Sequence, residues 1–423
     1  MPSRHFPVLP NLDQLRHQAK DLLRAIRRGE ADALAELREH HPQFADAASI
    51  RLADAQFVLA RSYGLPSWPR LVTACQMTNA IWRGDVETVR KLVLRNPRLI
   101  EEDARGVNGN WGPPLSYAAN LGKDAVIDML REFGASDLEY AFGRACLQGR
   151  VETARRLHAM MGSPQPPDDA LVGPAYTLSV SGTELLLELG VRVFDEHGKR
   201  IAPVDLVLET DSRKPSAKHR ILELYVEHGV TLPDTPTMAL HRGRIDLLEE
   251  HLRRDPNLLR RTFAHEDIYP PELGCHDEVL ATHGTPLAGT TLLHMCADYG
   301  EIEIARWLLD HGMHVDQRAT VGADGFGGHT ALFSAVVSQA NNHAGLPDAP
   351  LTRLLLDRGA DPKARASLRK QFHPGYEVAG VFEYRDVTPL EWGERFRLKQ
   401  LVSPAALDLI RERLGGAARD SRM

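Results

Sequence analysis

The chain has 423 residues, of which 43% are hydrophobic and 26% are charged, and its formal net charge at pH 7 is −6. This acidic balance argues against nucleic-acid binding, because nucleic-acid binders present a basic face to phosphates. No apolar run approaches the roughly 20 residues that span a bilayer, and residues 1–10 lack the apolar segment of a signal peptide. We therefore expect a cytoplasmic protein that binds neither nucleic acid nor membrane.

The N-terminal part of the chain predicts three amphipathic helices. The first follows Asn11, whose side chain can cap the free N–H groups of a helix start. The second covers residues 53–64 and ends on a Gly, and the third starts with Ser-Trp-Pro at residues 67–69. We interpret residues 1–76 as a helical cap that shields the apolar end of a repeat array. The alternative interpretation is an independent module that binds something itself.

A helix–turn–helix pattern then recurs along the chain. In three places an Ala is followed by a Gly four residues later and by a Pro thirteen residues after that Gly. The residue before Pro is pushed out of the α region, so the second helix of each pair should end there. The three matches begin at Ala25, Ala80 and Ala239, and a further relative begins at Ala145. This pattern predicts helix pairs and carries no information about chemistry.

In a second form of the pattern, both helices of the clearest copy end on Gly. The clearest copy covers residues 291–316, and further copies cover 114–135, 330–361 and 388–414. In the clearest copy Leu308 and Leu309 belong to an apolar stripe at helical spacing, so we expect both to be buried between neighbouring repeats. The glycines that should lie at helix ends are Gly122, Gly134, Gly149, Gly300, Gly312 and Gly359.

These units resemble ankyrin repeats, which are about 33 residues long and stack into a solenoid. The chain as a whole resembles bacterial ankyrin-repeat proteins that carry an N-terminal helical module. The residues that carry this resemblance are 11–23, 52–64, 67–69, 290–294 and 325–331. The resemblance implies an all-α fold: an ankyrin-repeat solenoid of stacked helix-turn-helix units, with long β-hairpin fingers and an N-terminal helical cap.

The domain organisation that follows has three parts. Residues 1–76 form the cap, residues 77–415 form the solenoid, and residues 416–423 form a disordered tail. Pro-rich segments interrupt the weak repeats of residues 165–235, so this stretch is expected to be irregular. The resemblance implies a binding role, and it implies no reaction and no ligand.

Two connections between repeats are too long for simple turns, at residues 263–289 and 365–388. The second alternates polar and apolar residues, which indicates a pair of strands. Long ordered loops on a rigid scaffold are where binding residues concentrate. The alternative is that these fingers pack on each other and cover the groove. Large side chains in the fingers and neighbouring connections are the candidate partner-binding residues: Trp111, Tyr269, His276, Phe326, Phe372 and Tyr376.

The sequence predicts neither a metal site nor a catalytic centre. Eight side chains around the first finger are of ligand type, but their spacing matches no zinc signature: His265, Glu266, Cys275, His276, Asp277, His283, His294 and Cys296. By its resemblance to the ankyrin-repeat histidine, His294 should hydrogen-bond within and between repeats. The Gly-rich residues 322–328 lack the flanking elements of a phosphate-binding loop and predict a turn.

We therefore expect a scaffold that binds a protein or peptide through a concave ankyrin groove and its hairpin fingers. It should be a monomer, need no cofactor and catalyse no reaction. The alternative function is an enzyme or small-molecule binder whose pocket is walled by residues 263–289 and 365–388. A closed pocket with converging ionisable groups would favour this alternative, and an open surface would favour the scaffold.

Overall fold

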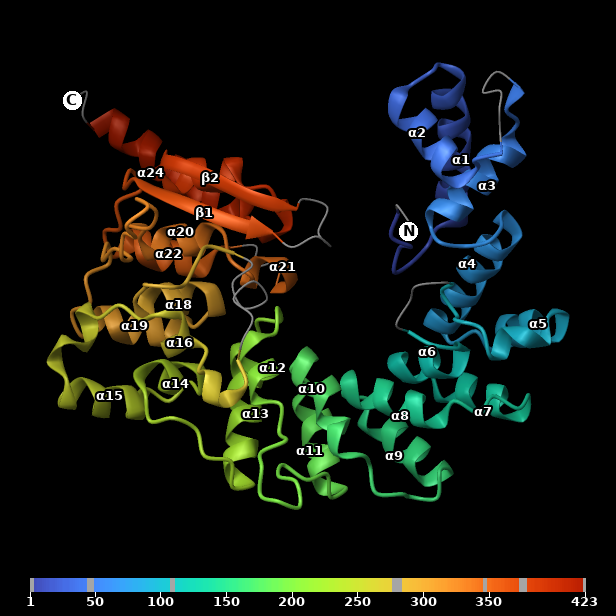
Figure 1. Ribbon diagram of the computed structural model, residues 1–423, viewed down its shortest axis with the longest axis horizontal. Coiled ribbons are helices and arrows are strands. Elements are labelled where there is room, and N and C mark those ends of the chain that lie inside the picture. Colours follow the sequence, from blue (N-terminus) through green and yellow to red (C-terminus); the bar gives the residue numbers. More distant parts are fainter. Residues whose placement is uncertain are drawn as a thin grey trace. The chain divides into compact units, whose positions relative to one another are not determined.

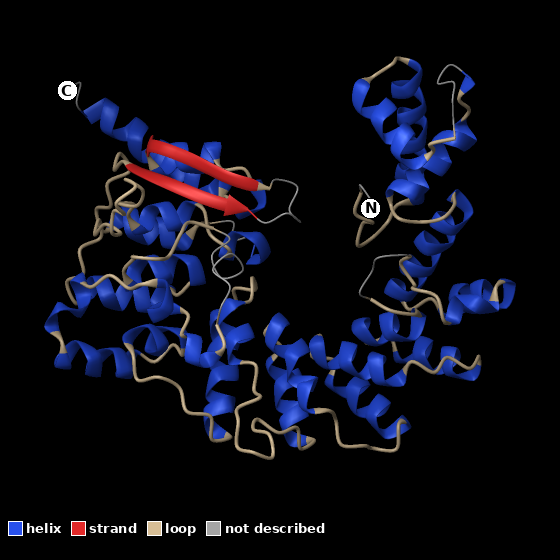
Figure 2. Ribbon diagram, in the orientation of Figure 1, coloured by secondary structure: helices blue, strands red, loops and turns tan. Residues whose placement is uncertain are grey.

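The chain is built almost entirely of helices, as the periodicity of its sequence predicts (Figure 2). The structure, a computed structural model, describes residues 4–43, 49–106, 111–275, 284–344, 348–372 and 379–420. The chain divides into two units, unit 1 (Met1–Pro166) and unit 2 (Pro167–Met423). In the parts of the chain that are described, no helix is both long and apolar enough to cross a membrane.

Unit 1 begins with the predicted helical module. Its helices are α1 (Leu12–Arg27), α2 (Ala31–His40), α3 (Leu52–Ser62) and α4 (Trp68–Arg83). Asn11 caps α1 as predicted, because its side chain accepts hydrogen bonds from the backbone N–H groups of Asp13 and Gln14 at 2.9 and 3.1 Å. The boundary predicted after residue 76 falls inside α4, which is continuous. Helix α4 therefore joins residues 1–76 to the residues that follow, and both belong to unit 1.

The rest of unit 1 is a stack of helix pairs. Its elements are α5 (Val86–Arg95), η2 (Pro97–Ile100), α6 (Pro114–Leu121), α7 (Asp124–Glu132), α8 (Leu138–Leu147) and α9 (Val151–Met160). Each first helix packs on its own second helix, and α6 packs on both α4 and α8 (Figure 1). The repeats of unit 1 are therefore stacked through their first helices.

The stretch predicted to be irregular, residues 165–235, contains two helix pairs in unit 2. The elements are η3 (Asp168–Leu171), α10 (Val172–Thr177), α11 (Val180–Glu188), α12 (Val204–Glu209) and α13 (Pro215–Glu227). Helix α10 packs on α12, and α11 packs on α13. Leu178 closes α10 in the left-handed conformation, with φ 53° and ψ 49°. Because this position usually holds Gly, a search for Gly at helix ends misses the repeat.

The remainder of unit 2 carries the clearest repeats. Its elements are α14 (Pro236–His241), α15 (Ile245–Arg254), η4 (Pro256–Arg260), α16 (His265–Ile268), η5 (Pro271–Leu273), α18 (Leu292–Tyr299), α19 (Ile302–Asp310), α20 (Ala331–Val336), α21 (Ala340–Ala344), α22 (Pro350–Asp357), β1 (Ala366–Phe372), β2 (Gly380–Val387), α23 (Pro389–Arg395), η6 (Lys399–Leu401) and α24 (Pro404–Asp420). Helix α20 packs on α18 on one side and on α23 on the other, and α18 and α20 are seen next to each other in Figure 1.

The predicted helix ends are confirmed. All six glycines lie one or two residues after the last residue of a helix and have positive φ: Gly122, Gly134, Gly149, Gly300, Gly312 and Gly359. Leu308 is fully buried, as its stripe predicts. Leu309 is half-buried, so the buried part of the stripe is narrower than predicted.

The two long connections differ from the prediction of two β-hairpin fingers. β1 and β2 pair in antiparallel fashion, which agrees with the alternation of the second connection. The described part of the first connection instead forms α16 and η5, with one isolated bridge between Phe263 and Thr290. The described residues of the first connection thus form no strand pair beyond this bridge, and the fold is mostly helical with one small two-stranded sheet, consistent with a helical repeat solenoid.

The last helix of the chain overlaps the segment predicted as a disordered tail. The prediction places the tail at residues 416–423, α24 is helical to Asp420, and residues 421–423 lie outside the described residues. Since no Pro interrupts this sequence after Pro404, the helix can continue through the paired glycines at 415 and 416.

Candidate binding surface

Trp111 lies in unit 1, in the connection that precedes α6, and its side chain is half-buried. The guanidinium groups of Arg105 and Arg144 lie 5.2 and 5.0 Å from the centre of its indole ring. Tyr117 meets the same ring edge-on, with centroids 5.8 Å apart. The indole therefore contacts two guanidinium groups and a tyrosine ring, and part of its surface is exposed to solvent.

The two arginines beside Trp111 are held in different ways. Arg105 donates to the backbone carbonyls of Phe6, Pro7 and Val8 at 3.1, 2.8 and 2.9 Å. It therefore anchors the N-terminal segment to the repeats of unit 1. Arg144, from α8, donates through Nη2 to the side-chain oxygen of Asn120 at 2.7 Å, and its Nε has no hydrogen-bond partner.

Tyr269, a predicted partner-binding residue, lies in the interior of unit 2 at 1% exposure. Its hydroxyl forms a 2.7 Å hydrogen bond with that of Tyr299, which also donates to the carbonyl of Leu208 at 2.8 Å. Because α16 and η5 turn the first connection inward, Tyr269 offers no surface to a partner. We therefore assign Tyr269 a structural role in the core instead of a contact with a partner.

A buried cluster of charges surrounds the end of α18. Arg213 pairs with Asp298 at 3.0 Å, and Lys218 pairs with Glu301 at 3.1 Å. Both cations also lie over the ring of Tyr299, at 4.3 and 4.0 Å from its centre. All four charged side chains are at most 4% exposed. The pairs tie the segment around α13 to α18 and neutralise each other inside the fold.

The surroundings of this cluster shift the pKa values of its members. Burial lowers the pKa of Lys218, and the nearby Glu301 opposes this shift without cancelling it. Burial alone would raise the pKa of Glu301, but Lys218 and His219 outweigh it and keep that pKa below its usual value. The charged form of Glu301 is thus favoured by its cationic neighbours, while burial works against the charge on Lys218.

Sequence reasoning did not identify this cluster, because its partners are distant along the chain. Arg213 and Asp298 are 85 residues apart. One local signal was available: residues 213–220 hold four Lys or Arg and no acid, whereas 298–303 hold three acids and no Lys or Arg. Unbalanced charge of opposite sign in two repeats indicates that they compensate each other.

The outer surface of unit 2 near β1 and β2 holds Phe326, another predicted contact residue. Its side chain is 8% exposed, because the guanidinium groups of Arg369 and Arg385 lie 4.0 and 4.5 Å from its ring centre. Arg369 pairs with Asp324 at 2.7 Å and with Glu383 at 3.0 Å. The Phe326 ring is therefore covered by the side chains of Arg369 and Arg385, which are themselves partly exposed.

The other predicted contact residues do not lie on a described surface. Phe372 is 3% exposed and packs between Phe382 and Phe396, with ring centroids 5.8 and 5.6 Å away. It belongs to the core under the hairpin, because β1 buries alternate side chains. His276 and Tyr376 lie outside the residues that the structure describes.

Backbone hydrogen bonds join the connections of unit 2 edge to edge. The N–H of Thr320 donates to the carbonyl of Gly289 at 2.8 Å, and the N–H of Gly327 donates to that of Ser367 at 2.7 Å. β1 then pairs with β2. We call this set the connection layer (residues 318–328, β1 and β2). It exposes two large apolar side chains, Val321 at 59% and Val381 at 57%.

His294 has the structural role that the resemblance implies. Its Nδ1 lies 2.9 Å from the Thr291 hydroxyl, and its Nε2 lies 3.1 Å from the carbonyl of His329 in the next repeat. Burial lowers the pKa of His294 to about 4, and burial together with His294 lowers that of His329 to about 3. Among the described residues, no group of three or more His, Cys, Asp or Glu is placed to hold a metal ion.

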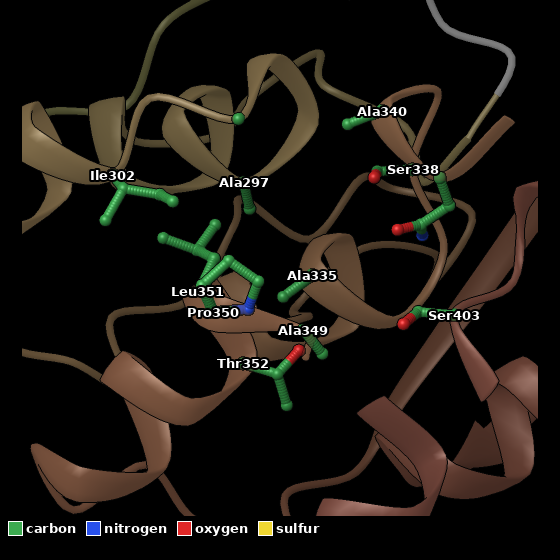
Figure 3. A pocket seen from close by; sticks show the side chains of 12 residues that line it. Ala297, Ile302, Ala335, Ser338, Ala340, Ala349, Pro350, Leu351, Thr352 and Ser403 are labelled. Atoms are coloured by element: carbon green, nitrogen blue, oxygen red, sulfur yellow. The ribbon is translucent and has the colours of Figure 1, made fainter. Parts of the chain in front are cut away.

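Two hollows in unit 2 bear on the small-molecule alternative. Leu351 and Pro350 approach Ala297 and Ala335 around a hollow of about 30 Å³ (Figure 3). This space is of the order of one water molecule. A larger hollow of about 230 Å³ is lined by Phe263 and Asp267 of the first connection, and none of its lining residues comes from the second connection.

Comparisons with known proteins identify the repeats of unit 2. Residues 239–366 match the family model "Ankyrin repeats (3 copies)". The human ASB11 ankyrin repeat domain is 16% identical and has a TM-score of 0.21, and the match covers 79% of this chain and 96% of that one. The ankyrin repeat domain of Bcl-3, a member of the IkappaB protein family, is 16% identical with a TM-score of 0.20, covering 79% of this chain and 97% of that one. No curated protein matches the chain.

Proposed function

We propose that the protein is a protein–protein interaction scaffold and that the connection layer of unit 2 is its main binding surface. Ankyrin repeats are in general protein-binding modules, and three copies lie in residues 239–366. The observation that carries the proposal is the backbone hydrogen bonding that joins residues 318–328 to β1, which in turn pairs with β2. These bonds connect segments that would otherwise be separate loops into one surface. Rigid surfaces lose little conformational entropy on binding.

The side chains of this layer suit a protein partner. Phe326 lies under Arg369 and Arg385, and aromatic and Arg side chains are enriched among the residues that dominate binding energy. Val321 and Val381 add exposed apolar area. The ion pairs of Arg369 and Arg385 with Glu383 are exposed, so a partner carboxylate can replace Glu383 at small cost.

The proposal includes several points that rest on the sequence alone. These are a bacterial cytoplasmic location, a monomeric state, and the absence of a cofactor and of catalysis. The enzyme or small-molecule alternative has less support, because Tyr269 and Phe372, large side chains of the two connections, point into the interior rather than into a shared pocket.

Affinity capture with matched surface variants tests the proposal. Val321→Asp and Val381→Asp change exposed side chains of the layer, and Val172→Asp changes a side chain that is 44% exposed on α10 of the same unit. A partner captured by the natural chain should bind the two layer variants at least about tenfold more weakly when purified, since each substitution sets a charge against an apolar contact. It should bind the α10 variant unchanged. Unaltered affinity in both layer variants would place the binding surface elsewhere.

A further inference from the structure

A hollow of about 240 Å³ in unit 1 is lined by residues of α4, α5 and the first residue of α1. Helix α5 contributes Lys91 and Arg95, which are four residues apart and therefore lie on one face of the helix. Helix α4 contributes Arg83, its last residue. All three are exposed residues, so the cationic side chains of this hollow are open to a group that arrives from solvent.

The charges that line this hollow have one sign. The lining holds two Arg and one Lys and no Asp or Glu, which gives it a formal charge of +3 in a chain whose net charge is −6. In the part of the chain that the structure describes, Arg83, Lys91 and Arg95 form no ion pair. By contrast, Arg90 of α5, which does not line the hollow, pairs with two carboxylates at 3.7 and 3.9 Å.

Asp85 is a carboxylate that interacts electrostatically with Arg83 and Lys91, but it does not line the hollow. Its Oδ1 accepts a hydrogen bond from the backbone N–H of Thr88 at 3.0 Å, and its Oδ2 accepts one from the Thr88 hydroxyl at 2.6 Å. These hydrogen bonds, together with the two cations, lower the pKa of Asp85. A single carboxylate that caps a helix leaves the three cations with an excess of positive charge.

The two hollows of unit 2 differ from this one in their charges. No charged residue lines the hollow of about 30 Å³. Three Asp and two Arg line the hollow of about 230 Å³, where Asp234 pairs with Arg254 at 2.8 Å. The hollow of unit 1 is therefore distinguished by cations that no lining carboxylate compensates.

We propose that this hollow binds the phosphate group of an organic phosphomonoester. Such a group carries about −1.5 to −2 charges at pH 7 and has three acceptor oxygens, so three cationic side chains can share it. A carboxylate offers one charge and two oxygens. Arg binds phosphate through two parallel N–H donors, and Lys binds it as a point charge.

The remaining lining of the hollow suits the organic part of such a ligand. The hollow has eight times the volume of the smaller one in unit 2, 240 against 30 Å³, so it has room for more than a phosphate group. Leu12 and Leu92 supply apolar wall, and the exposed Gln76 supplies an amide. The site lies outside the connection layer, so the inference does not rest on the proposed function.

A titration of the full chain with small probes tests the site. The probe is phenyl phosphate, followed by the NMR relaxation of its ring protons, and phenyl sulfate is the control of similar shape with one negative charge. Phenyl phosphate should bind saturably and at least about threefold more tightly than phenyl sulfate, because each exposed charge contact contributes a factor of this order. Equal affinities, or no saturable binding of either probe, would overturn the proposal.

Two further probes define the ligand. Phthalate carries two negative charges on carboxylates, and tighter binding of phthalate than of phenyl phosphate would overturn the phosphate assignment. Acetyl-phosphoserine amide represents a phosphorylated side chain of a protein. If it binds more tightly than phenyl phosphate, it supports the site and assigns the phosphate to a phosphoprotein, whereas weaker binding supports the site and assigns it to a free ester.

A matched pair of double variants locates the binding. Lys91→Gln/Arg95→Gln should weaken phenyl phosphate binding about tenfold, since two contacts of about threefold each multiply. Lys20→Gln/Arg38→Gln makes the same change of net charge at exposed residues of α1 and α2, and it should leave the affinity within about twofold. All four residues are exposed, so circular dichroism should show both variants folded. Equal weakening in both variants, or unchanged affinity in the first, would overturn the site.

Discussion

Unit 1 and unit 2 both bury cationic side chains, but they compensate the charge differently. In unit 2, Arg213 and Lys218 lie 3.0 and 3.1 Å from carboxylates of the same unit. In unit 1, Arg144 meets an amide oxygen and an indole ring. A buried ion pair ties two segments together, and removing one partner leaves an uncompensated charge in the interior. Arg213 and Lys218 are therefore expected to depend on their carboxylates, whereas Arg144 depends on a neutral amide and an indole ring.

The largest expected effect comes from removing a carboxylate in unit 2. Asp298→Asn leaves Arg213 buried without a counter-charge, so the free energy of unfolding should fall by about 3–5 kcal/mol. Denaturant unfolding measures the loss, and hydrogen exchange of α18 locates it. The double variant Arg213→Met/Asp298→Leu should recover most of the stability, because it removes both charges. A loss below about 1 kcal/mol in the single variant would show that the pair is not needed to compensate Arg213.

Leu308→Ala, which shortens an apolar side chain in the same repeat, provides a reference for the loss of stability expected in Asp298→Asn. Leu308 is fully buried, and Leu308→Ala should cost about 2–5 kcal/mol. Because repeats couple mainly to their neighbours, hydrogen exchange should accelerate first around α18 to α22. Leu94→Ala, at a side chain that is 62% exposed in unit 1, should have little effect. Uniform acceleration along the whole chain would contradict a nearest-neighbour array.

Acid should weaken unit 2 through its buried histidines. The pKa of His294 is about 4 in the folded chain, below the unperturbed value near 6.5. Between these values the unfolded chain binds more protons, so stability falls as pH falls through this range and is retained above it. At pH 5 the loss from His294 is about 2 kcal/mol.

The control for the acid effect is a variant without the titrating ring. His294→Gln should be less stable at pH 7, but its stability should fall less between pH 7 and pH 5. Denaturant unfolding at both pH values, followed by hydrogen exchange in α18, gives the comparison. Parallel pH dependence in the two chains would show that His294 does not titrate as its burial requires.

The smallest expected effect belongs to the exposed charges of the connection layer. Glu383 is 40% exposed and pairs with Arg369 and Arg385. Glu383→Gln should therefore change the free energy of unfolding by less than about 1 kcal/mol. Thermal unfolding of the variant measures the change, and a loss comparable to that of Asp298→Asn would remove the distinction between buried and exposed pairs.

Much of the fold follows from local sequence signals. Asn11 begins α1, Gly300 and Gly312 close their helices, and the alternation after residue 365 marks β1 and β2. The sequence also assigns His294 correctly to bonding within and between repeats. The prediction is least specific where a local rule has an exception: Leu178 takes the left-handed position that Gly usually occupies, so the sequence shows only weak, interrupted repeats in residues 165–235.

The candidate site was less predictable than the fold. Tyr269, Phe326 and Phe372 were chosen because they are large and belong to no helical stripe, but such side chains suit a core as well as a surface. Trp111 stays a predicted partner-binding residue, and the sequence gives no sign of the two arginines around its ring. The sequence indicates that a large aromatic side chain will be in contact with other groups, but it does not indicate which residues or partners those groups belong to.

The sequence by itself determined the helices, their ends, the repeat unit and the strand pair, because each depends on residues within about one repeat. Only the tertiary structure decided that Tyr269 meets Tyr299, that Arg213 meets Asp298, and that Arg144 meets no carboxylate in the described chain. The physical reason is that periodicity specifies which face of a helix is buried. What covers that face depends on the path of the chain over tens of residues.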